Sequence, residues 1–95
     1  MAVAFEWDHA KDVANQAKHG VAFKEASTVF GDPLAWFQPD EQHSQDEERF
    51  LLLGRSSANR LLAVLFTDRG ADMIRVISAR PATPRERRKY EEDFR

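Results

Sequence analysis

The pattern of apolar and polar residues predicts two short helices in the first third of the chain. Residues 5–7 are typical of a short edge strand, and Asp8 is a suitable N-cap for a helix that follows it. Small apolar residues recur at helical spacing up to Gly20, which suits the left-handed position that ends a helix: Ala10, Val13, Ala14 and Ala17. A second helix is expected over 23–30. Because so few residues join the two helices, we expect a helical hairpin that covers one face of a sheet.

The middle of the chain is predicted to consist mainly of strands. After a strand at 34–37 and a polar, mostly acidic loop at 39–48, the pattern predicts strands at 49–54, 61–67 and 73–79. The second of these three is apolar on both faces, which is typical of a central strand covered on both sides. The helical hairpin can cover one face, and the other face needs the C-terminal helix, a partner chain or both.

The chain is expected to end in a strand followed by a helix. Strict alternation divides the last strand into two faces: Ile74, Val76 and Ser78 on one, and Arg75, Ile77 and Ala79 on the other. Thr83 and Glu86 form a Thr-x-x-Glu capping box, with Pro84 at the first turn of a helix that runs to about Phe94. The 95 residues predict a single α+β domain over 1–95, with a mainly antiparallel sheet of about four strands.

Composition and charge narrow the range of partners. A hydrophobic content of 42% excludes a disordered chain, and the absence of cysteine excludes disulfides and thiolate zinc sites. Residues 1–48 hold three basic and ten acidic side chains, a net charge of −7, whereas residues 49–95 hold eleven basic and six acidic ones, a net charge of +5. All ten arginines lie at or after Arg49. This asymmetry favours a polyanionic partner, because the arginine fork binds phosphate in a bidentate manner.

The chain is expected to be soluble and cytoplasmic. Its first seven residues have neither the basic flank nor the apolar stretch of a signal peptide. The longest apolar run, Leu61–Phe66, has the length of a strand and is far too short to span a membrane. The absence of cysteine agrees with a reducing compartment.

Metal-dependent catalysis is not indicated, whereas metal-free RNA cleavage is chemically possible. The three histidines share no metal-binding spacing, and no glycine-rich nucleotide loop or nucleophile motif is present. RNA cleavage without metal needs groups that remove the 2′-hydroxyl proton, stabilise the phosphate and protonate the leaving 5′-oxygen. Suitable side chains occur along the chain: Lys18, His19, His43, Glu48, Arg49, Arg75, Arg80 and Tyr90. Most basic domains contain such a set, and the alternative is that these charged groups form surface ion pairs or are simply exposed.

An ordered series of short motifs covers nearly the whole chain, about residues 5–92. Its main members are Phe5-Glu6-Trp7-Asp8, Asn15-x-x-Lys18-His19-Gly20-Val21, Glu47-Glu48-Arg49-Phe50, Thr67-x-Arg69-Gly70, Ile74-Arg75-x-Ile77-Ser78-Ala79-Arg80 and Ala82-Thr83-x-x-Glu86-Arg87. In this order and spacing, the series resembles the BrnT family of toxins, the ribonuclease components of type II toxin–antitoxin systems. The resemblance implies a RelE-like fold and metal-independent RNA cleavage that inhibits translation.

The resemblance, together with the arginines at the ends of two adjacent strands, gives a set of expected site residues. We expect the catalytic groups to be His43, Glu48, Arg49, Arg80 and His19. We expect RNA to be bound by Lys18, Arg55, Arg69 and Arg75. No metal or other cofactor is expected. The alternative is a non-catalytic RNA- or protein-binding module of the same fold, which would bind RNA with a steep salt dependence and never cleave it.

The resemblance also implies the partners of the chain. A BrnA-type antitoxin with a ribbon-helix-helix domain would neutralise the toxin in a heterotetramer or higher hetero-oligomer. DNA would be contacted only through this antitoxin, and no membrane is involved. Ala22 departs from the family pattern, which usually has Ser or Thr there to cap the second helix, and we expect the loss of this cap to cost about 1 kcal/mol.

Overall fold

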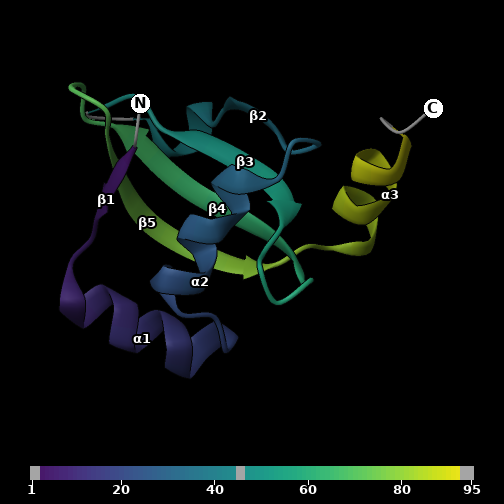
Figure 1. The fold of residues 1–95 in the computed structure, drawn as a ribbon, viewed down its shortest axis with the longest axis horizontal. Coiled ribbons are helices and arrows are strands. Elements are labelled where there is room, and N and C mark those ends of the chain that lie inside the picture. The colour runs from purple at the N-terminus through teal and green to yellow at the C-terminus, as the bar shows by residue number, and fades with distance from the viewer. Residues whose placement is uncertain (1–2, 45–46, 93–95) are drawn as a thin grey trace.

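A five-stranded mixed sheet lies at the centre of the computed structural model, which describes residues 3–44 and 47–92 apart from the side chain of His43 (Figure 1). In sheet order, the strands are β1 (Ala4–Glu6), β5 (Met73–Pro81), β4 (Leu61–Asp68), β3 (Phe50–Arg55) and β2 (Trp36–Pro39). β1 runs parallel to β5, and all other neighbours are antiparallel. The expectation of about four strands is wrong by one, because residues 4–6 pair with residues 73–75 and extend the sheet.

The helices are α1 (His9–His19), α2 (Phe23–Thr28) and α3 (Pro84–Glu92), with 3₁₀ turns η1 (Val29–Gly31) and η2 (Glu41–His43). The predicted ends of α1 are confirmed, since the Asp8 carboxylate accepts a backbone N–H of the first turn and Gly20 has a φ of 69°. The capping box of α3 is also confirmed by two reciprocal hydrogen bonds between Thr83 and Glu86. Phe94, predicted near the end of this helix, lies outside the described residues.

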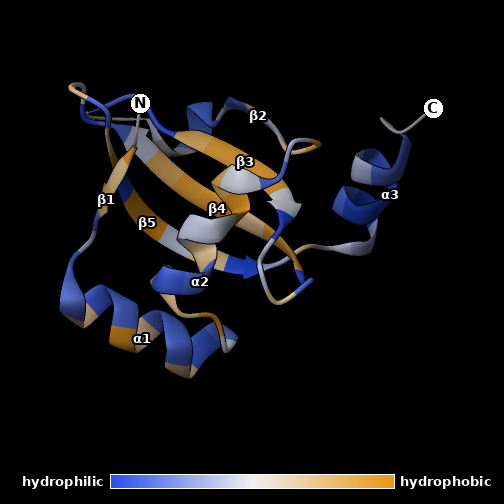
Figure 2. Ribbon diagram, in the orientation of Figure 1, coloured by the Kyte–Doolittle hydropathy of each residue, from blue (hydrophilic) through white to orange (hydrophobic). Residues whose placement is uncertain are grey.

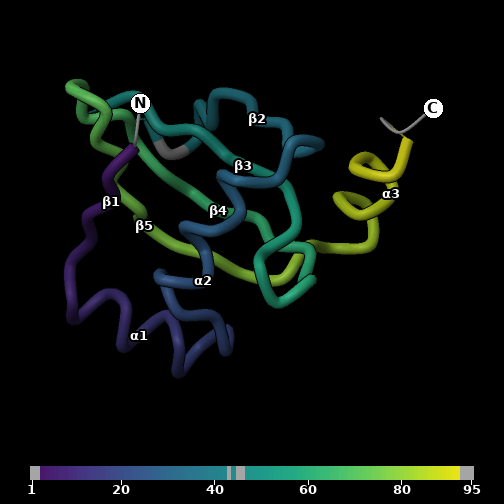
Figure 3. Tube along the Cα trace, in the orientation of Figure 1, coloured from purple at the N-terminus to yellow at the C-terminus, as the bar shows by residue number. Residues whose placement is uncertain are grey.

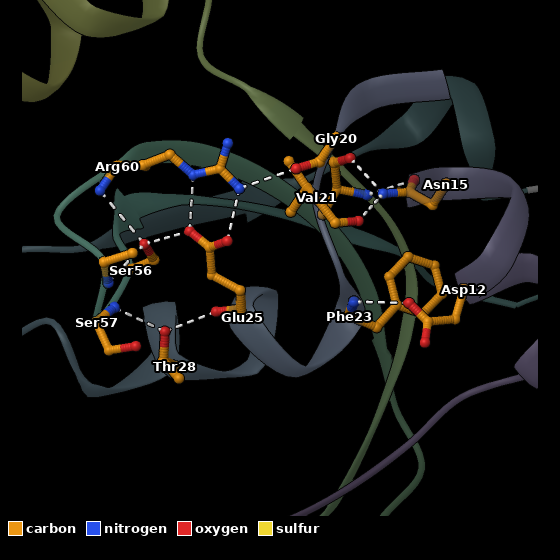
Figure 4. A network of polar contacts seen from close by, with 12 residues as sticks. Asp12, Asn15, Gly20, Val21, Phe23, Glu25, Thr28, Ser56, Ser57 and Arg60 are labelled. Carbon is orange, nitrogen blue, oxygen red and sulfur yellow. Dashed lines mark hydrogen bonds and ion pairs between the residues drawn. The ribbon is translucent and has the colours of Figure 1, made fainter. Parts of the chain in front are cut away.

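α1 and α2 both lie against β5, and they run in different directions (Figure 1). The structure therefore does not show the expected helical hairpin. Ala22 provides no side-chain cap for α2, as the sequence indicates. The carboxylate of Asp12 in α1 instead accepts the Phe23 N–H at 2.9 Å (Figure 4). One helix thus supplies the N-terminal acceptor that the next helix lacks.

The sheet carries a hydrophobic core on each face. The larger cluster lies on the side of α1 and α2, and its fully buried members include Phe23, Leu62, Val64 and Val76. A smaller cluster on the other face contains Tyr90 of α3. Every residue from 61 to 67 is buried, which confirms the prediction of a central strand covered on both sides. Figure 2 shows the apolar residues concentrated on β3, β4 and β5, whereas α1 and α3 are largely hydrophilic.

A β-bulge in β5 interrupts the expected alternation of faces. Leu65 of β4 pairs with Ser78, but the next β4 residue, Phe66, pairs with Val76. Ile77 is therefore an extra residue without a partner of its own. Because side chains alternate with a period of two, one inserted residue exchanges the faces of all residues that follow it.

The bulge corrects the predicted faces of the last strand. Ala79 joins Val76 in the core on the helix side, and Ser78 lies on the opposite face, so both of these predictions are wrong. Arg80 also changes sides and lies on the same face as Arg75, since their partners in β4 are four residues apart on one strand. This face is opposite α1 and α2.

Asn15 closes the open edge of β5. β1 pairs with residues 73–75, so within the described parts of the chain the later part of β5 has no neighbouring strand on that side. The Asn15 carboxamide, which is 8% exposed, donates to the Ala79 carbonyl at 2.8 Å and accepts from the Ala79 N–H at 3.1 Å. It also donates to the Val21 carbonyl at 2.8 Å (Figure 4). One side chain thus satisfies three backbone groups and ties α1 to the sheet.

A second polar cluster ties the β3–β4 turn to the helices (Figure 4). The Arg60 guanidinium donates to both oxygens of Glu25 at 2.9 and 2.6 Å and to the Gly20 carbonyl at 3.0 Å. The Ser56 hydroxyl donates to Glu25 at 2.7 Å. The Arg60 hydrogen bonds are the main reason why the pKa of Glu25 is lowered. Arg60 therefore has a structural role, and its charge does not belong to the surface proposed to bind a polyanion, although it is one of the eleven basic side chains in residues 49–95.

Candidate functional site

The face of the sheet opposite α1 and α2 carries arginines from three separate segments. Arg75 belongs to β5, Arg69 to the β4–β5 turn, and Arg49 directly precedes β3. α3 packs on this face through Tyr90. Figure 3 shows the β4–β5 turn and the start of β1 at the end of the sheet that is far from α3.

Two glutamates link these arginines into what we call the arginine–glutamate network: Arg49, Arg69, Arg75, Glu6 and Glu47. Glu6 lies 3.0 Å from Nη1 of Arg75 and 3.7 Å from Nε of Arg69. Glu47 lies 3.5 Å from Nη1 of Arg69 and 3.6 Å from Nη2 of Arg49. The three arginine side chains are 30%, 34% and 48% exposed. Solvent and ligands therefore reach a set of charges in which the cations outnumber the anions.

The network can exchange its internal ion pairs for contacts with a ligand. Ion pairs at this exposure typically contribute less than about 1 kcal/mol each, and the arginine fork binds phosphate well. An open groove of about 620 Å³ adjoins the network. Its described lining residues are Glu47, Glu48, Phe50, Thr67, Asp68, Arg69 and Gly70. Nε of Arg49 is buried and has no hydrogen-bond partner among the described residues. A phosphate can therefore replace a glutamate at these arginines at little cost in stability.

Arg80 lies on the same face but is held by α3. Its guanidinium donates to both carboxylate oxygens of Glu86, at 2.7 and 3.0 Å. These hydrogen bonds are the main reason why the pKa of Glu86 is lowered and that of Arg80 is raised. Since Glu86 also caps α3 through Thr83, Arg80 joins the end of β5 to the start of the helix.

Lys18 and His19 lie at the edge of this face, outside the groove that adjoins the network. They line a smaller groove of about 220 Å³ with Lys11, Ile77 and Ser78. Ser78 belongs to the arginine side of the sheet. The structure thus brings Lys18 and His19 to the border of the arginine face.

The other expected site residues fall into different surroundings. Glu48 is exposed and lines the same groove as Arg69. Arg55 lies over the Tyr90 ring at 5.9 Å, on the side of α3. His43 belongs to η2, and its side chain lies outside the described part of the chain.

Glu6 and Glu47 are the members of the network that the sequence did not single out as site residues. Glu6 stands in a short edge strand, where a charged residue is ordinary. Its position beside Arg75 follows from the parallel pairing of β1 with β5, which joins residues 69 positions apart. Glu47 appears in the sequence only as part of the Glu47-Glu48-Arg49-Phe50 motif. No local pattern marks either residue.

Within the ranges 3–44 and 47–92, no group of three or more His, Cys, Asp or Glu side chains is arranged to hold a metal ion. None of the described helices has the length and apolar character needed to cross a membrane.

A buried tyrosine–aspartate pair fastens α3 to the sheet. Tyr90 is 2% exposed and donates its hydroxyl to Asp32 at 2.6 Å. Asp32 also accepts the N–H groups of Leu34 and Arg55. Burial and the hydrogen bond to Asp32 raise the pKa of Tyr90 to about 12. Burial alone would raise the pKa of Asp32, but the hydrogen bonds from Tyr90 and the two N–H groups outweigh it, so this pKa is lowered.

Ionisation of Tyr90 is expected to loosen this attachment at high pH. The tyrosine pKa is about 12 in the folded chain and 10 without its environment, so the stabilisation is complete below pH 10 and is lost as the pH rises from 10 to 12. Two pKa units correspond to about 2–3 kcal/mol. Tyr90 is the only tyrosine, so ultraviolet absorbance of tyrosinate follows it alone.

Two controls define the tyrosine experiment. The unfolded chain in urea should titrate near pH 10, and Tyr90→Phe should remove the stability change that depends on this group. A midpoint near 10 in the folded chain would contradict the buried pair.

Comparison with known proteins identifies the class of this α+β domain. The family described as "Ribonuclease toxin, BrnT, of type II toxin-antitoxin system" matches residues 7–86. The 1.1 Å crystal structure of the Brucella abortus ribonuclease toxin, BrnT, is similar, with a TM-score of 0.67 and 26% sequence identity over 86% of this chain and 99% of that one. A search of curated proteins gives no match. The class is thus that of small α+β ribonuclease toxins.

The chain belongs to the BrnT family of type II toxin–antitoxin systems. The match confirms the resemblance seen in the ordered motifs, and it extends over most of the chain. As a toxin of a type II system, the protein has an antitoxin as its partner.

Proposed function

We propose that this chain is a metal-independent endoribonuclease that binds the RNA backbone on its arginine–glutamate network. The observation that carries the proposal is the meeting of Arg49, Arg69 and Arg75 on one open face of the sheet. Membership of a family of ribonuclease toxins supports it. Further contacts to the RNA backbone are proposed for Lys18, Arg55 and Arg80.

In the proposed reaction, a 2′-hydroxyl attacks the adjacent phosphate and the bond to the 5′-oxygen breaks, which yields a 2′,3′-cyclic phosphate and a 5′-hydroxyl. Glu48 is proposed as the base, because its exposed side chain lines the groove beside Arg69. Arg49, Arg69 and Arg75 would stabilise the negative charge that develops on the phosphate. His43 or His19 would protonate the leaving oxygen.

Family membership also supports proposals about the mode of action, the type of antitoxin and the composition of the complex. We propose a RelE-like mode of action in which RNA cleavage inhibits translation in the cytoplasm. The antitoxin is proposed to be of the BrnA type, with a ribbon-helix-helix domain that alone contacts DNA. The complex would be a heterotetramer or a higher hetero-oligomer.

A non-catalytic RNA- or protein-binding module of the same fold is the second candidate. The observation that favours it is the pairing of the network arginines with Glu6 and Glu47, which leaves a modest positive charge for phosphate. Such a module would bind RNA with an affinity that falls steeply with salt and would leave it intact.

Cleavage in the presence of EDTA separates the two candidates. The purified chain is expected to cut single-stranded RNA in excess EDTA, since no proposed step needs a metal. Gel electrophoresis with analysis of the new ends should show 2′,3′-cyclic phosphates, and DNA of the same sequence should stay intact because it lacks the 2′-hydroxyl. Binding without cleavage would favour the module, and the absence of both would contradict both candidates.

A further inference from the structure

An apolar groove lies on the face of the sheet opposite the arginine–glutamate network. We call it the aromatic groove, and its lining includes Phe30, Phe37, Phe50, Phe66, Asp68 and Ile74. Its volume is about 270 Å³. Phe66 belongs to the core cluster on the side of α1 and α2, and Phe30, Phe50 and Ile74 pack against that cluster.

The groove is bounded by an aromatic side chain that the chain itself leaves uncovered. Phe37 of β2 is 61% exposed, although its ring lies 5.9 Å from Phe50 and 6.3 Å from Phe66. β2 is the edge strand of the sheet formed by the described residues, so Phe37 has neighbouring side chains from β3 on one side only. Large exposed apolar residues beside an apolar groove are typical of an interaction surface.

A second apolar groove continues this surface on the other side of an aromatic pair. The rings of Phe5 and Phe30 lie 5.1 Å apart. Beyond them lies a groove of about 410 Å³, lined by both rings and by Val3, which is 49% exposed. The surface therefore offers two adjacent places for apolar side chains, one on each side of Phe30.

The charge of the aromatic groove decides what kind of partner fits it. Asp68 is the one charged residue among the described residues that line it, and no lysine or arginine lines either groove. RNA is disfavoured because the described lining residues of the two grooves include no cation to bind its phosphates. A second copy that binds through the same surface, as in a two-fold symmetric dimer, is disfavoured because it would place another Asp68 opposite the first. A protein segment with apolar anchors and a basic side chain fits both features.

The geometry points to the aromatic groove as the docking site of the antitoxin. The antitoxin would present two apolar anchors on either side of Phe30 and a basic side chain opposite Asp68. This inference rests on the antitoxin partnership of the proposed function and adds its location. The arginine–glutamate network and the aromatic groove lie on opposite faces of the sheet, although the groove beside the network shares Phe50 and Asp68 with the aromatic groove. Among the described lining residues, Phe37 belongs to the aromatic groove and not to the groove beside the network, so its substitution can weaken neutralisation and leave cleavage intact.

The test uses the full chain and its purified antitoxin. Phe37→Ser is expected to weaken antitoxin binding on the order of 30-fold or more, as for a central interface anchor, with RNA cleavage in EDTA unchanged. Leu34→Ser is the matched control, because Leu34 is 47% exposed and lies outside both grooves. It should leave binding and cleavage as in the wild type. Asp68→Asn keeps the acceptor for the Gly70 N–H and should weaken binding mainly at low salt.

Each further outcome has a definite meaning. If Phe37→Ser binds the antitoxin as tightly as the wild type, the docking site is wrong while the proposed ribonuclease stands. If Phe37→Ser loses RNA cleavage but retains its melting temperature, the groove binds RNA and the inference fails. If the toxin alone dimerises and Phe37→Ser makes it monomeric, the occupant is a second copy and the inference also fails. If the wild type cuts RNA but does not bind the antitoxin, the partnership itself is refuted.

Discussion

The Arg75→Ala variant is expected to cleave RNA on the order of 100-fold more slowly than the wild type. Arg75 lies on the open face of the sheet, 3.0 Å from Glu6, and its guanidinium is 34% exposed. A preorganised cation that stabilises the charge of the transition state is typically worth this factor in rate. The fold should survive, because the side chain is partly exposed and its ion pair contributes little to stability. Single-turnover cleavage in EDTA measures the effect.

Three further variants make the Arg75 experiment specific. Arg75→Lys keeps the charge but loses the planar fork, so an intermediate rate is expected. Lys24→Ala removes an exposed cation from α2, on the other side of the sheet, and should cleave like the wild type. Glu6→Gln should tighten RNA binding, since Glu6 competes with phosphate for Arg75 and Arg69. An Arg75→Ala variant with the wild-type rate would remove this residue from the proposed site.

The Asn15→Asp variant is expected to lose about 3 kcal/mol or more of its free energy of unfolding. The substitution keeps the shape of the side chain but replaces the amide that donates to the carbonyls of Val21 and Ala79. A carboxylate would then face two carbonyl oxygens at a position that is 8% exposed. Each buried group left without a partner costs about 1–3 kcal/mol, and an unpaired buried charge adds to this. For a domain of this size, the melting temperature should fall on the order of 15 °C.

Urea denaturation at pH 7 measures this loss, with Gln42→Glu as the control. The Gln42→Glu substitution makes the same change from amide to carboxylate at an exposed position of η2. Its stability should stay within about 0.5 kcal/mol of the wild type. Equal losses in the two variants would contradict the role of Asn15 at the open edge of β5.

Much of the fold could be predicted because local signals agree with one another. The N-cap at Asp8, the left-handed Gly20 and the capping box that begins at Thr83 are each recognised from a few neighbouring residues, and the structure confirms all three. The central strand was recognised because 61–67 is apolar on both faces. The helical hairpin was not seen, since a short connection constrains the ends of two helices and does not determine what each one packs against.

The candidate site was predicted less completely, for the same reason. Arg49, Arg69 and Arg75 were named from the sequence, and the structure brings them into one network. The carboxylates that join them were not named as site residues. Glu6 meets Arg75 only because β1 pairs in parallel with β5, and no periodic pattern encodes the partner of an edge strand.

The sequence by itself determined the helix ends, the central strand, the uneven charge and the family of this protein, because these depend on residues close together or on motifs in a fixed order. Only the tertiary structure decided which charges meet. The bulge at Ile77 arises from the pairing of β4 with β5, and it places Arg80 on the side of Arg75 and turns Ala79 into the core. A period of two along one strand cannot reveal an inserted residue, since the insertion exists only relative to the neighbouring strand. The two faces of the sheet, one charged and one aromatic, follow from that pairing.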